Sequence, residues 1–218
     1  MDPKVPAGIL FDLDGTLADT VDLILMSYRH TMTVHLGAAP PDERWLATIG
    51  TPLPIQLADF ARDETERLAM RETYVAYQRG IHDEMVRAFP SAAEVLGALR
   101  DRGTRVAVVT SKAAGIARRT MEVCGLWGLV DFVVAGDEVV RGKPDPEPVL
   151  RALSGVGLVG RAGEVVFVGD APVDLRAGRA AGTRTAAVGW GPHGRSVLEA
   201  ERPDYFLERL TDVLTIPG

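Results

Sequence analysis

The chain has 218 residues, of which 46% are hydrophobic and 25% charged, and its formal net charge is −6. This composition predicts a soluble globular protein with one large domain, or one domain with an insertion, and a core that needs no disulfide. The single cysteine excludes an internal disulfide and fits a reducing compartment. Basic residues are scattered along the chain, so nucleic acid is an improbable partner.

No apolar run approaches the ~20 residues that a membrane span needs. Asp12 and Asp14 interrupt the first apolar stretch, which argues against a secretory signal. We therefore expect a cytoplasmic protein with no membrane partner, acting as a monomer or a homodimer.

Short apolar runs alternate with amphipathic stretches along most of the chain, and the runs predict buried strands. These runs are Val5–Phe11, Arg105–Thr110, Phe132–Ala135, Val165–Gly169 and Arg184–Val188. The predicted helices are Ser91–Arg102, Ala113–Cys124, Glu147–Val156, Val173–Ala181 and Ser196–Ala200. The alternation predicts an α/β fold with a doubly wound, mostly parallel, Rossmann-like sheet that binds ligands at the carboxyl ends of its strands.

One segment contains no strand-like run and predicts helices instead. Apolar residues recur at helical spacing in two stripes, which are Val21, Leu25, Tyr28 and Met32, and Met70, Tyr74, Tyr77, Ile81 and Met85. These stripes are most simply a small core. We expect residues 18–87 to form a helical cap inserted after the first strand, and residues 1–17 and 88–218 to form the catalytic core.

Two acids follow the first strand. In an extended segment the side chains of Asp12 and Asp14 project to the same side, and Gly15 lets the backbone turn. Two carboxylates so close repel each other unless a cation lies between them, and oxygen ligands with few charges favour Mg²⁺. Either acid could instead cap the next helix or start a turn.

A second pair of acids, Asp170 and Asp174, follows the strand Val165–Gly169. Parallel strands bring their carboxyl ends to one edge, so Asp170 can face Asp12. Asp174 lies about one helical turn further on, where it could also act as a first-turn acid favoured by the helix dipole.

Two further polar features lie at predicted strand ends. Thr110 and Ser111 begin a helix, where hydroxyls and backbone amides form a phosphate seat or an ordinary helix cap. Lys143 lies between the third strand and the next helix in Gly-Lys-Pro-Asp-Pro, whose prolines restrict the loop. It is one of three lysines among 24 basic residues. These features favour a functional lysine over a solvated one.

Taken in order, DLDGTL, VVTSK, GKPDP and GDAPVD resemble the four motifs of the haloacid-dehalogenase-like hydrolase superfamily. The resemblance covers essentially the whole chain, including the cap. DGTLADT, LATIGTPL, KPDPEPVL and AGTRTAAVGWG are similar to the phosphoglycolate phosphatase branch. TSK, YQRGIHDEMV and HGRSVL also look like the pyrophosphatase members of that branch.

The resemblance implies a catalytic role for five residues. Asp12 would be the nucleophile that forms an aspartyl-phosphate. Asp14 would protonate the leaving group and then deprotonate the attacking water. Thr110 and the Ser111 amide would hold the phosphoryl oxygens, and Lys143 would bridge the phosphate and Asp12.

The resemblance also implies Mg²⁺ as the cofactor. The carboxylates of Asp12 and Asp170 and the backbone carbonyl of Asp14 would contact the ion, and Asp174 would support it from behind or through water. The four acids would repel a phosphate dianion without the positive charges of Lys143 and the metal, so electrostatics predict metal dependence.

The cap is expected to select the substrate by covering the strand-end site. Thr48, Gly50 and Thr51 resemble the family's cap loop that reaches the site. Three further cap side chains could contact an anion or lie on a solvated helix face: Arg44, Arg79 and His82. His193 is more simply a loop residue than a ligand.

Two positions depart from the family pattern. Ala171 stands where the family usually has Ser, Thr or another polar residue, so one supporting hydrogen bond is expected to be missing. Phe89-Pro90-Ser91 replaces the usual Pro-Gly step at the return from the cap, which can alter the hinge.

We therefore expect a Mg²⁺-dependent phosphatase that acts on a small soluble phosphate monoester. Phosphoglycolate is the leading substrate, and inorganic pyrophosphate is close behind. A phosphoglucomutase-type phosphotransferase uses the same core and stays open. A phospho-acceptor signalling domain is a further alternative, although such domains usually carry the acceptor aspartate later and lack a helical insert.

Overall fold

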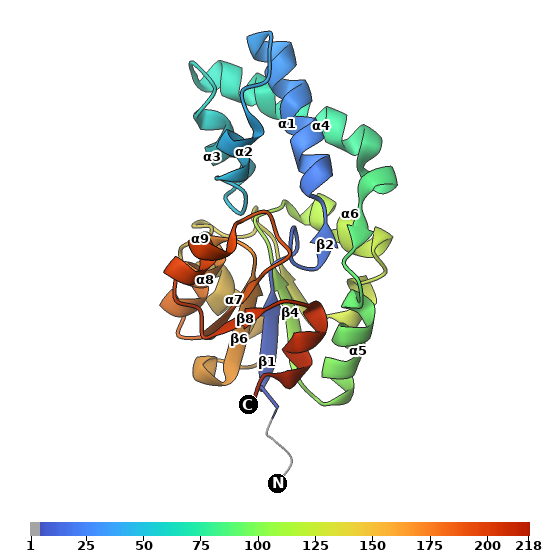
Figure 1. Cartoon of the computed structure of the whole chain (residues 1–218), viewed down its shortest axis with the longest axis vertical. Helices are drawn as coiled ribbons and strands as arrows, with labels where there is room; N and C mark the ends of the chain where they lie inside the picture. Colours follow the sequence, from blue (N-terminus) through green and yellow to red (C-terminus); the bar gives the residue numbers. More distant parts are fainter. Residues whose placement is uncertain (1–4) are drawn as a thin grey trace.

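The computed structural model describes residues 5–218 and shows an α/β body beneath a helical part (Figure 1). Its main sheet has six parallel strands in the order β5-β4-β1-β6-β7-β8. The strands are β1 (Gly8–Phe11), β4 (Arg105–Val109), β5 (Phe132–Val134), β6 (Val165–Gly169), β7 (Arg184–Val188) and β8 (Tyr205–Leu207). The predicted fold class is confirmed.

Helices cover both faces of the sheet, as the unbroken apolar runs of its central strands require. The helices of the body are α5 (Ala92–Asp101), α6 (Ala114–Val123), α7 (Glu147–Gly155), α8 (Pro172–Ala180) and α9 (Arg195–Ala200), and they lie on both sides of the sheet (Figure 1). Successive residues of β1 alternate between the faces: Ile9 and Phe11 pack toward α5 and α6, and Leu10 packs toward α7 and α8. Three short 3-10 helices complete it: Trp127–Leu129, Ala162–Glu164 and Leu210–Thr215.

The strand β8 was not predicted from the sequence. Its three residues are too few to show a strand pattern, and its position is decided by pairing with β7. Asp204, just before β8, accepts a hydrogen bond from the backbone amide of Thr185 at 2.7 Å, which ties the two segments together. The first strand is also shorter than predicted, because it begins at Gly8 rather than Val5.

The helical part has a hydrophobic core of its own. It contains α1 (Val21–Leu36), α2 (Asp42–Leu46), α3 (Leu53–Ala58) and α4 (Glu64–Met85). Tyr28 stacks on the buried Trp45 with ring centroids 4.7 Å apart, and Met70 packs in the same cluster. The C-terminal half of the apolar stripe predicted for α4 lies outside this cluster. Tyr77, for example, stacks on His30 with ring centroids 4.0 Å apart.

A short antiparallel ribbon joins the helical part to the body. It pairs β2 (Ala18–Asp19) with β3 (Arg87–Ala88), so the outgoing and returning chains lie side by side. Just beyond, Ser91 has a φ of 65°, in the left-handed region that favours glycine. Serine therefore keeps the backbone turn expected of Pro-Gly at this return.

The predicted division into a cap of residues 18–87 and a core of residues 1–17 and 88–218 stays a prediction. The separate hydrophobic cluster and the ribbon at its base support it. Residues 1–4 of the predicted core lie outside the described residues.

Within residues 5–218, none of the helices combines the length and apolar character that crossing a membrane requires.

The packing of Gly155 predicts a stability effect. A Cβ at this position would lie 2.3 Å from the Phe132 ring, so Gly155→Ala should destabilise the fold by about 1–3 kcal/mol through overpacking. Gly97, in α5, is the matched control because a Cβ there meets nothing within 4 Å. Gly97→Ala should stabilise the helix by up to about 1 kcal/mol. Urea unfolding measures both, and equal effects of the two substitutions would contradict this account of the packing.

Candidate active site

Three adjacent strands bring polar side chains to one edge of the sheet. Asp12 follows β1, Thr110 follows β4 and Asp170 follows β6, and β1 lies between the other two strands. The register aligns Phe11 with both Val108 and Val168, so the three strands end at nearly the same level. The predicted meeting of Asp12 and Asp170 is what the structure shows.

A buried cluster of charges lies just beyond this edge. Asp12, Asp170 and Asp174 each place a carboxylate oxygen within 4.8 Å of the others. The ammonium group of Lys143 lies 2.8 Å from Asp12 Oδ1 and 2.6 Å from Asp174 Oδ1, and its side chain is only 1% exposed. The lysine singled out in the sequence therefore joins the acids of two strand ends.

Burial shifts the pKa values of the charged groups in this cluster. Burial raises the pKa of Asp12 to about 7, although the nearby charge of Lys143 acts to lower it. Burial and the charges of Asp12 and Asp174 hold the pKa of Asp170 well above its usual range. Burial by itself lowers the pKa of Lys143, but Asp12 and Asp174 outweigh it and the net shift is upward. The carboxylates thus need further positive charge nearby to be stable as anions.

The donor set fits a divalent cation such as Mg²⁺. Asp170 Oδ1 accepts a hydrogen bond from Thr16, but the buried Oδ2 has no hydrogen-bond partner among the described residues. Gly15 has a φ of +79°, and a Cβ on it would lie 2.6 Å from this same oxygen. A buried, unpartnered carboxylate oxygen in an all-oxygen cluster is suited to a hard cation.

Asp174 is placed differently from the other two acids. Its Oδ1 accepts from Lys143, and its Oδ2 accepts from the backbone amide of Ala171 at 3.0 Å. Because both oxygens already have donors, the position suits the supporting role that the family resemblance implies.

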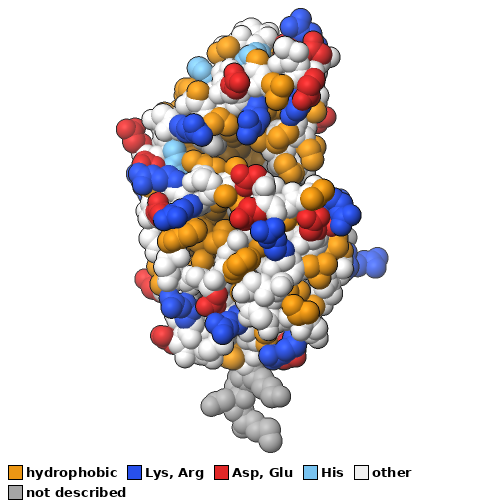
Figure 2. Space-filling model, turned by 180° about the vertical axis from the view of Figure 1, so that it is seen from behind, with side chains coloured by type: hydrophobic (Ala, Val, Ile, Leu, Met, Phe, Trp, Pro, Cys, Tyr) orange, Lys and Arg blue, Asp and Glu red, His pale blue; other side chains and the backbone are white. Residues whose placement is uncertain are grey.

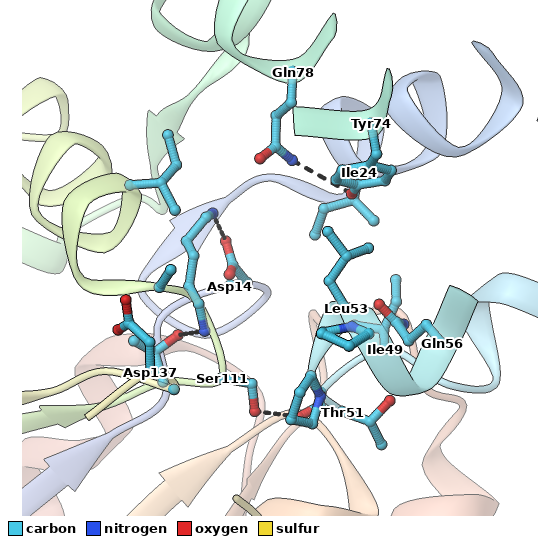
Figure 3. A pocket seen from close by; sticks show the side chains of 18 of the residues that line it. Asp14, Ile24, Ile49, Thr51, Leu53, Gln56, Tyr74, Gln78, Ser111 and Asp137 are labelled. Carbon is cyan, nitrogen blue, oxygen red and sulfur yellow. Dashed lines mark hydrogen bonds and ion pairs between the residues drawn. The ribbon is translucent and has the colours of Figure 1, made fainter. Parts of the chain in front are cut away.

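Asp14 lies apart from this cluster and lines a cavity between the body and the helical part (Figure 3). Its Oδ1 accepts from Thr20 at 2.6 Å and from Lys112 at 2.5 Å. The ion pair with Lys112 was not predicted. The available signal was the position of Lys112, directly after Thr110 and Ser111 at a strand end.

Thr110 and Ser111 line the same cavity, and both side chains are engaged. Thr110 Oγ1 accepts from the backbone amide of Lys112 at 3.1 Å. Ser111 Oγ donates to the carbonyl of Gly50 at 2.6 Å, which holds the cap loop against the body (Figure 3). The structure therefore brings the predicted phosphate seat and the predicted cap loop together.

The cap loop closes on Ala171. Gly50 has a φ of +98°, and a Cβ on it would lie 2.8 Å from the Ala171 Cβ. A small side chain at position 171 leaves room for this approach. Gly50 and Thr51 line the cavity, but Thr48 does not. The Thr48 hydroxyl donates to Trp45 and accepts from Gln56, so it braces the loop from behind.

The cavity has a volume of about 330 Å³. The body forms its floor and the cap forms its roof, and the two differ in polarity. Asp12, Asp14 and Lys143 line it from the body. The cap contributes six apolar side chains, which are Ile24, Ile49, Pro52, Leu53, Pro54 and Val75, and five polar ones, which are Thr51, Gln56, Arg71, Tyr74 and Gln78. Seen from behind, hydrophobic side chains gather where the two parts meet, and charged side chains of both signs lie beside them and over the rest of this face (Figure 2).

Other cap candidates lie away from this cavity. Arg44 lies over the Phe60 ring at 4.9 Å, and Arg79 is exposed on α4. His82 is neither an anion contact in the cavity nor solvated: it is buried against α6, where its Nε2 lies 2.9 Å from Thr120 Oγ1. The spacing of α4 could not show this, because the partner belongs to the body. His193 lies in the loop after β7, and its burial lowers its pKa.

These residues are suited to one class of enzyme. Buried carboxylates and a lysine at the carboxyl edge of a parallel sheet, beneath a helical part, suit phosphoryl chemistry.

Comparisons with known proteins agree with this class. A family model for haloacid dehalogenase-like hydrolases matches residues 9–188. The chain is 38% identical over 218 residues to pyrophosphatase PpaX of Bacillus velezensis, covering 100% of this chain and 99% of that protein. It is 36% identical over 211 residues to pyrophosphatase PpaX of Anoxybacillus flavithermus, covering 96% of each.

The crystal structure of a predicted phosphoglycolate phosphatase from Haemophilus somnus 129PT superimposes with a TM-score of 0.85. It has 23% sequence identity and covers 96% of both chains, which shows a shared fold. The chain belongs to the haloacid dehalogenase-like hydrolase family, and it is a phosphatase of that family. The family and enzyme class expected from the sequence are confirmed, and a signalling domain is excluded.

The acid cluster predicts that Mg²⁺ stabilises the fold. At a concentration a hundredfold above its Kd, Mg²⁺ should raise the Tm of the wild type by roughly 5–10 °C. Asp170→Asn should abolish this shift. Its metal-free form should be at least as stable as the wild type, because the substitution removes a repelled buried charge. Thermal unfolding with and without Mg²⁺ tests this, and an unchanged shift in the variant would exclude Asp170 as a ligand.

The contact of Gly50 with Ala171 predicts that closure of the cap loop is sensitive to one methyl group. Gly50→Ala should lower kcat/KM by about 10- to 100-fold, because a displaced loop misplaces the substrate. Gly37→Ala is the matched control: Gly37 also has a positive φ of +81°, but a Cβ there meets nothing within 4 Å. Equal kinetic losses in the two variants would show that backbone strain, rather than the contact, causes the effect.

Proposed function

We propose that this chain is a Mg²⁺-dependent phosphatase that cleaves small phosphate compounds through an aspartyl-phosphate on Asp12. One observation carries the proposal: Lys143 is buried between Asp12 and Asp174 at the floor of a cavity closed by the cap. A lysine in this position costs desolvation, and its charge is available to a bound phosphoryl group.

The first half of the reaction uses the residues at the sheet edge. Lys143 holds Asp12 Oδ1, so Oδ2 is the oxygen that attacks phosphorus while the bond to the leaving group breaks. Asp14 donates a proton to the departing oxygen. Thr110 and the Ser111 amide hold the phosphoryl oxygens as their charge is redistributed.

The second half returns the enzyme to its starting state. Asp14, now a carboxylate, removes a proton from water, and the water oxygen attacks phosphorus. The Asp12–phosphorus bond breaks, phosphate is released and Asp14 is protonated again. Mg²⁺, held by Asp12, Asp170 and the Asp14 carbonyl with Asp174 behind them, would supply charge that offsets the acids and the phosphate.

Pyrophosphate is the substrate we propose first. The two relatives described above match nearly the whole chain, and both are named pyrophosphatases. Lys112 and Arg71 line the cavity in addition to Lys143, and their charges suit an anionic leaving group. Phosphoglycolate is the second candidate, because its short organic part could contact the apolar roof formed by Ile24, Leu53 and Val75.

The proposal also includes a movement of the cap and the cellular compartment in which the enzyme acts. Residues 18–87 would act as one unit that turns about the ribbon of β2 and β3 to admit substrate and release phosphate. We place the reaction in the cytoplasm, where the single cysteine would remain reduced.

Phosphate release by the purified protein tests the proposal. The panel contains pyrophosphate, phosphoglycolate, glucose 1-phosphate and an aryl phosphate, each with Mg²⁺ and with chelator. Asp12→Asn should lower kcat by about a thousandfold or more without changing Tm greatly, since the nucleophile is lost. The matched control, Asp101→Asn, changes an exposed aspartate at the end of α5 and should leave the rate unchanged.

Three results would contradict the proposal. Substantial turnover by Asp12→Asn would exclude Asp12 as the nucleophile. Full activity in chelator would exclude the metal. Interconversion of glucose phosphates faster than phosphate release would favour the phosphoglucomutase-type alternative over hydrolysis.

A further inference from the structure

Lys112 is a nearly buried cation to which the proposed chemistry gives no step. It follows Ser111 in the loop between β4 and α6, and its side chain is 8% exposed. Its ammonium group lies 2.5 Å from Asp14 Oδ1. Removing a lysine this far from water is costly unless its donors find acceptors. The Asp14 side chain supplies such an acceptor inside the cavity.

The two donors to Asp14 leave one of its oxygens available. Thr20, just before α1, and Lys112 both donate to Oδ1. None of the hydrogen bonds found within residues 5–218 involves Oδ2 of Asp14. A carboxylate fixed through one oxygen can exchange a proton through the other, provided that its plane is held in the right orientation.

Lys112 also touches the phosphate seat. Its backbone amide donates to Thr110 Oγ1 at 3.1 Å, while its side chain reaches Asp14. One residue therefore fixes the relation between the hydroxyl expected to hold the phosphoryl group and the carboxylate expected to protonate the leaving oxygen. A shift of about 1 Å in such a relation can cost a hundredfold in rate.

We propose that Lys112 is a positioning residue for Asp14, which orients Oδ2 toward the leaving-group oxygen and so sets how well the enzyme cleaves bonds whose leaving group must be protonated. This inference rests on the proposed function. Lys112 keeps its own proton throughout. The proton on the leaving group comes from Asp14 as the phosphorus–oxygen bond breaks, and the proton lost by water returns to Asp14.

Two phosphate esters separate this role from a general loss of structure. Ethyl phosphate has an alkoxide leaving group that needs a proton, whereas 4-nitrophenyl phosphate releases a phenolate that does not. Neither leaving group carries a second charge that Lys112 could bind. Lys112→Met should lower kcat/KM for ethyl phosphate by about 10- to 100-fold. It should change kcat/KM for 4-nitrophenyl phosphate by less than about threefold, because kcat/KM reports the steps up to formation of the aspartyl-phosphate and excludes the water attack that both esters share.

A double-substitution cycle tests whether Lys112 acts through Asp14. With ethyl phosphate, Lys112→Met should have little further effect once Asp14→Asn is present, because coupled residues are non-additive. Lys112→Arg should retain part of the rate that Lys112→Met loses, since arginine keeps the positive charge of lysine but differs from it in shape. Arg29→Met, which removes an exposed cation paired with Asp42 in the cap, is the matched control and should leave both rates unchanged.

The possible failures are distinguishable. Absence of Asp12-dependent hydrolysis of 4-nitrophenyl phosphate by the wild type would overturn the proposed function and this inference with it. With wild-type activity present, equal losses of kcat/KM on both esters or additive losses in the cycle would overturn the inference alone. A wild type that cleaves 4-nitrophenyl phosphate but not ethyl phosphate would also overturn it, because no leaving-group protonation would then be at work.

Discussion

The position of Lys143 among three buried carboxylates is the constraint on which the site depends. Lone charges at this depth would be unstable, and the lysine is stabilised there because Asp12 and Asp174 accept its hydrogen bonds. These acids come from different strand ends, so the ion pairs also tie β1 to the start of α8 and to the loop before α7. The remaining negative charge, with Asp170 Oδ2 unpartnered, prepares the cluster for a cation.

The segment Thr110–Lys112 links this buried cluster to the helical part of the molecule. Its three consecutive side chains make three different contacts. Thr110 belongs to the predicted phosphate seat, Ser111 donates to the Gly50 carbonyl and Lys112 donates to Asp14. In the proposed mechanism, one short loop at the end of β4 would therefore both hold the cap loop and complete the catalytic group. Such coupling would let the enzyme exclude water at the same time as it aligns its acid.

Much of the fold followed from local pattern because the central strands are continuous apolar runs and the cap helices have 3.6-residue periodicity. The prediction was weakest where tertiary pairing outweighs local preference. β8 exists because β7 offers it a partner, and His82 is buried because Thr120 of α6 lies beside it. The lower half of α4 likewise extends beyond the cap core toward the body, which its uniform stripe of large apolar residues did not reveal.

For the site, the sequence by itself determined which kinds of side chain are present. These are acids, hydroxyls and a lysine beside proline, and they follow the predicted strands. Because parallel strands end at one edge, this order was enough to predict that Asp12 and Asp170 meet. Only the tertiary structure decided which donor each oxygen receives. The Lys112–Asp14 pair, the placement of Thr48 behind its loop and the fit of Gly50 on Ala171 depend on distances of a few ångströms between segments far apart in the chain. Local spacing carries no information about such distances, since they are set by how the cap packs on the sheet.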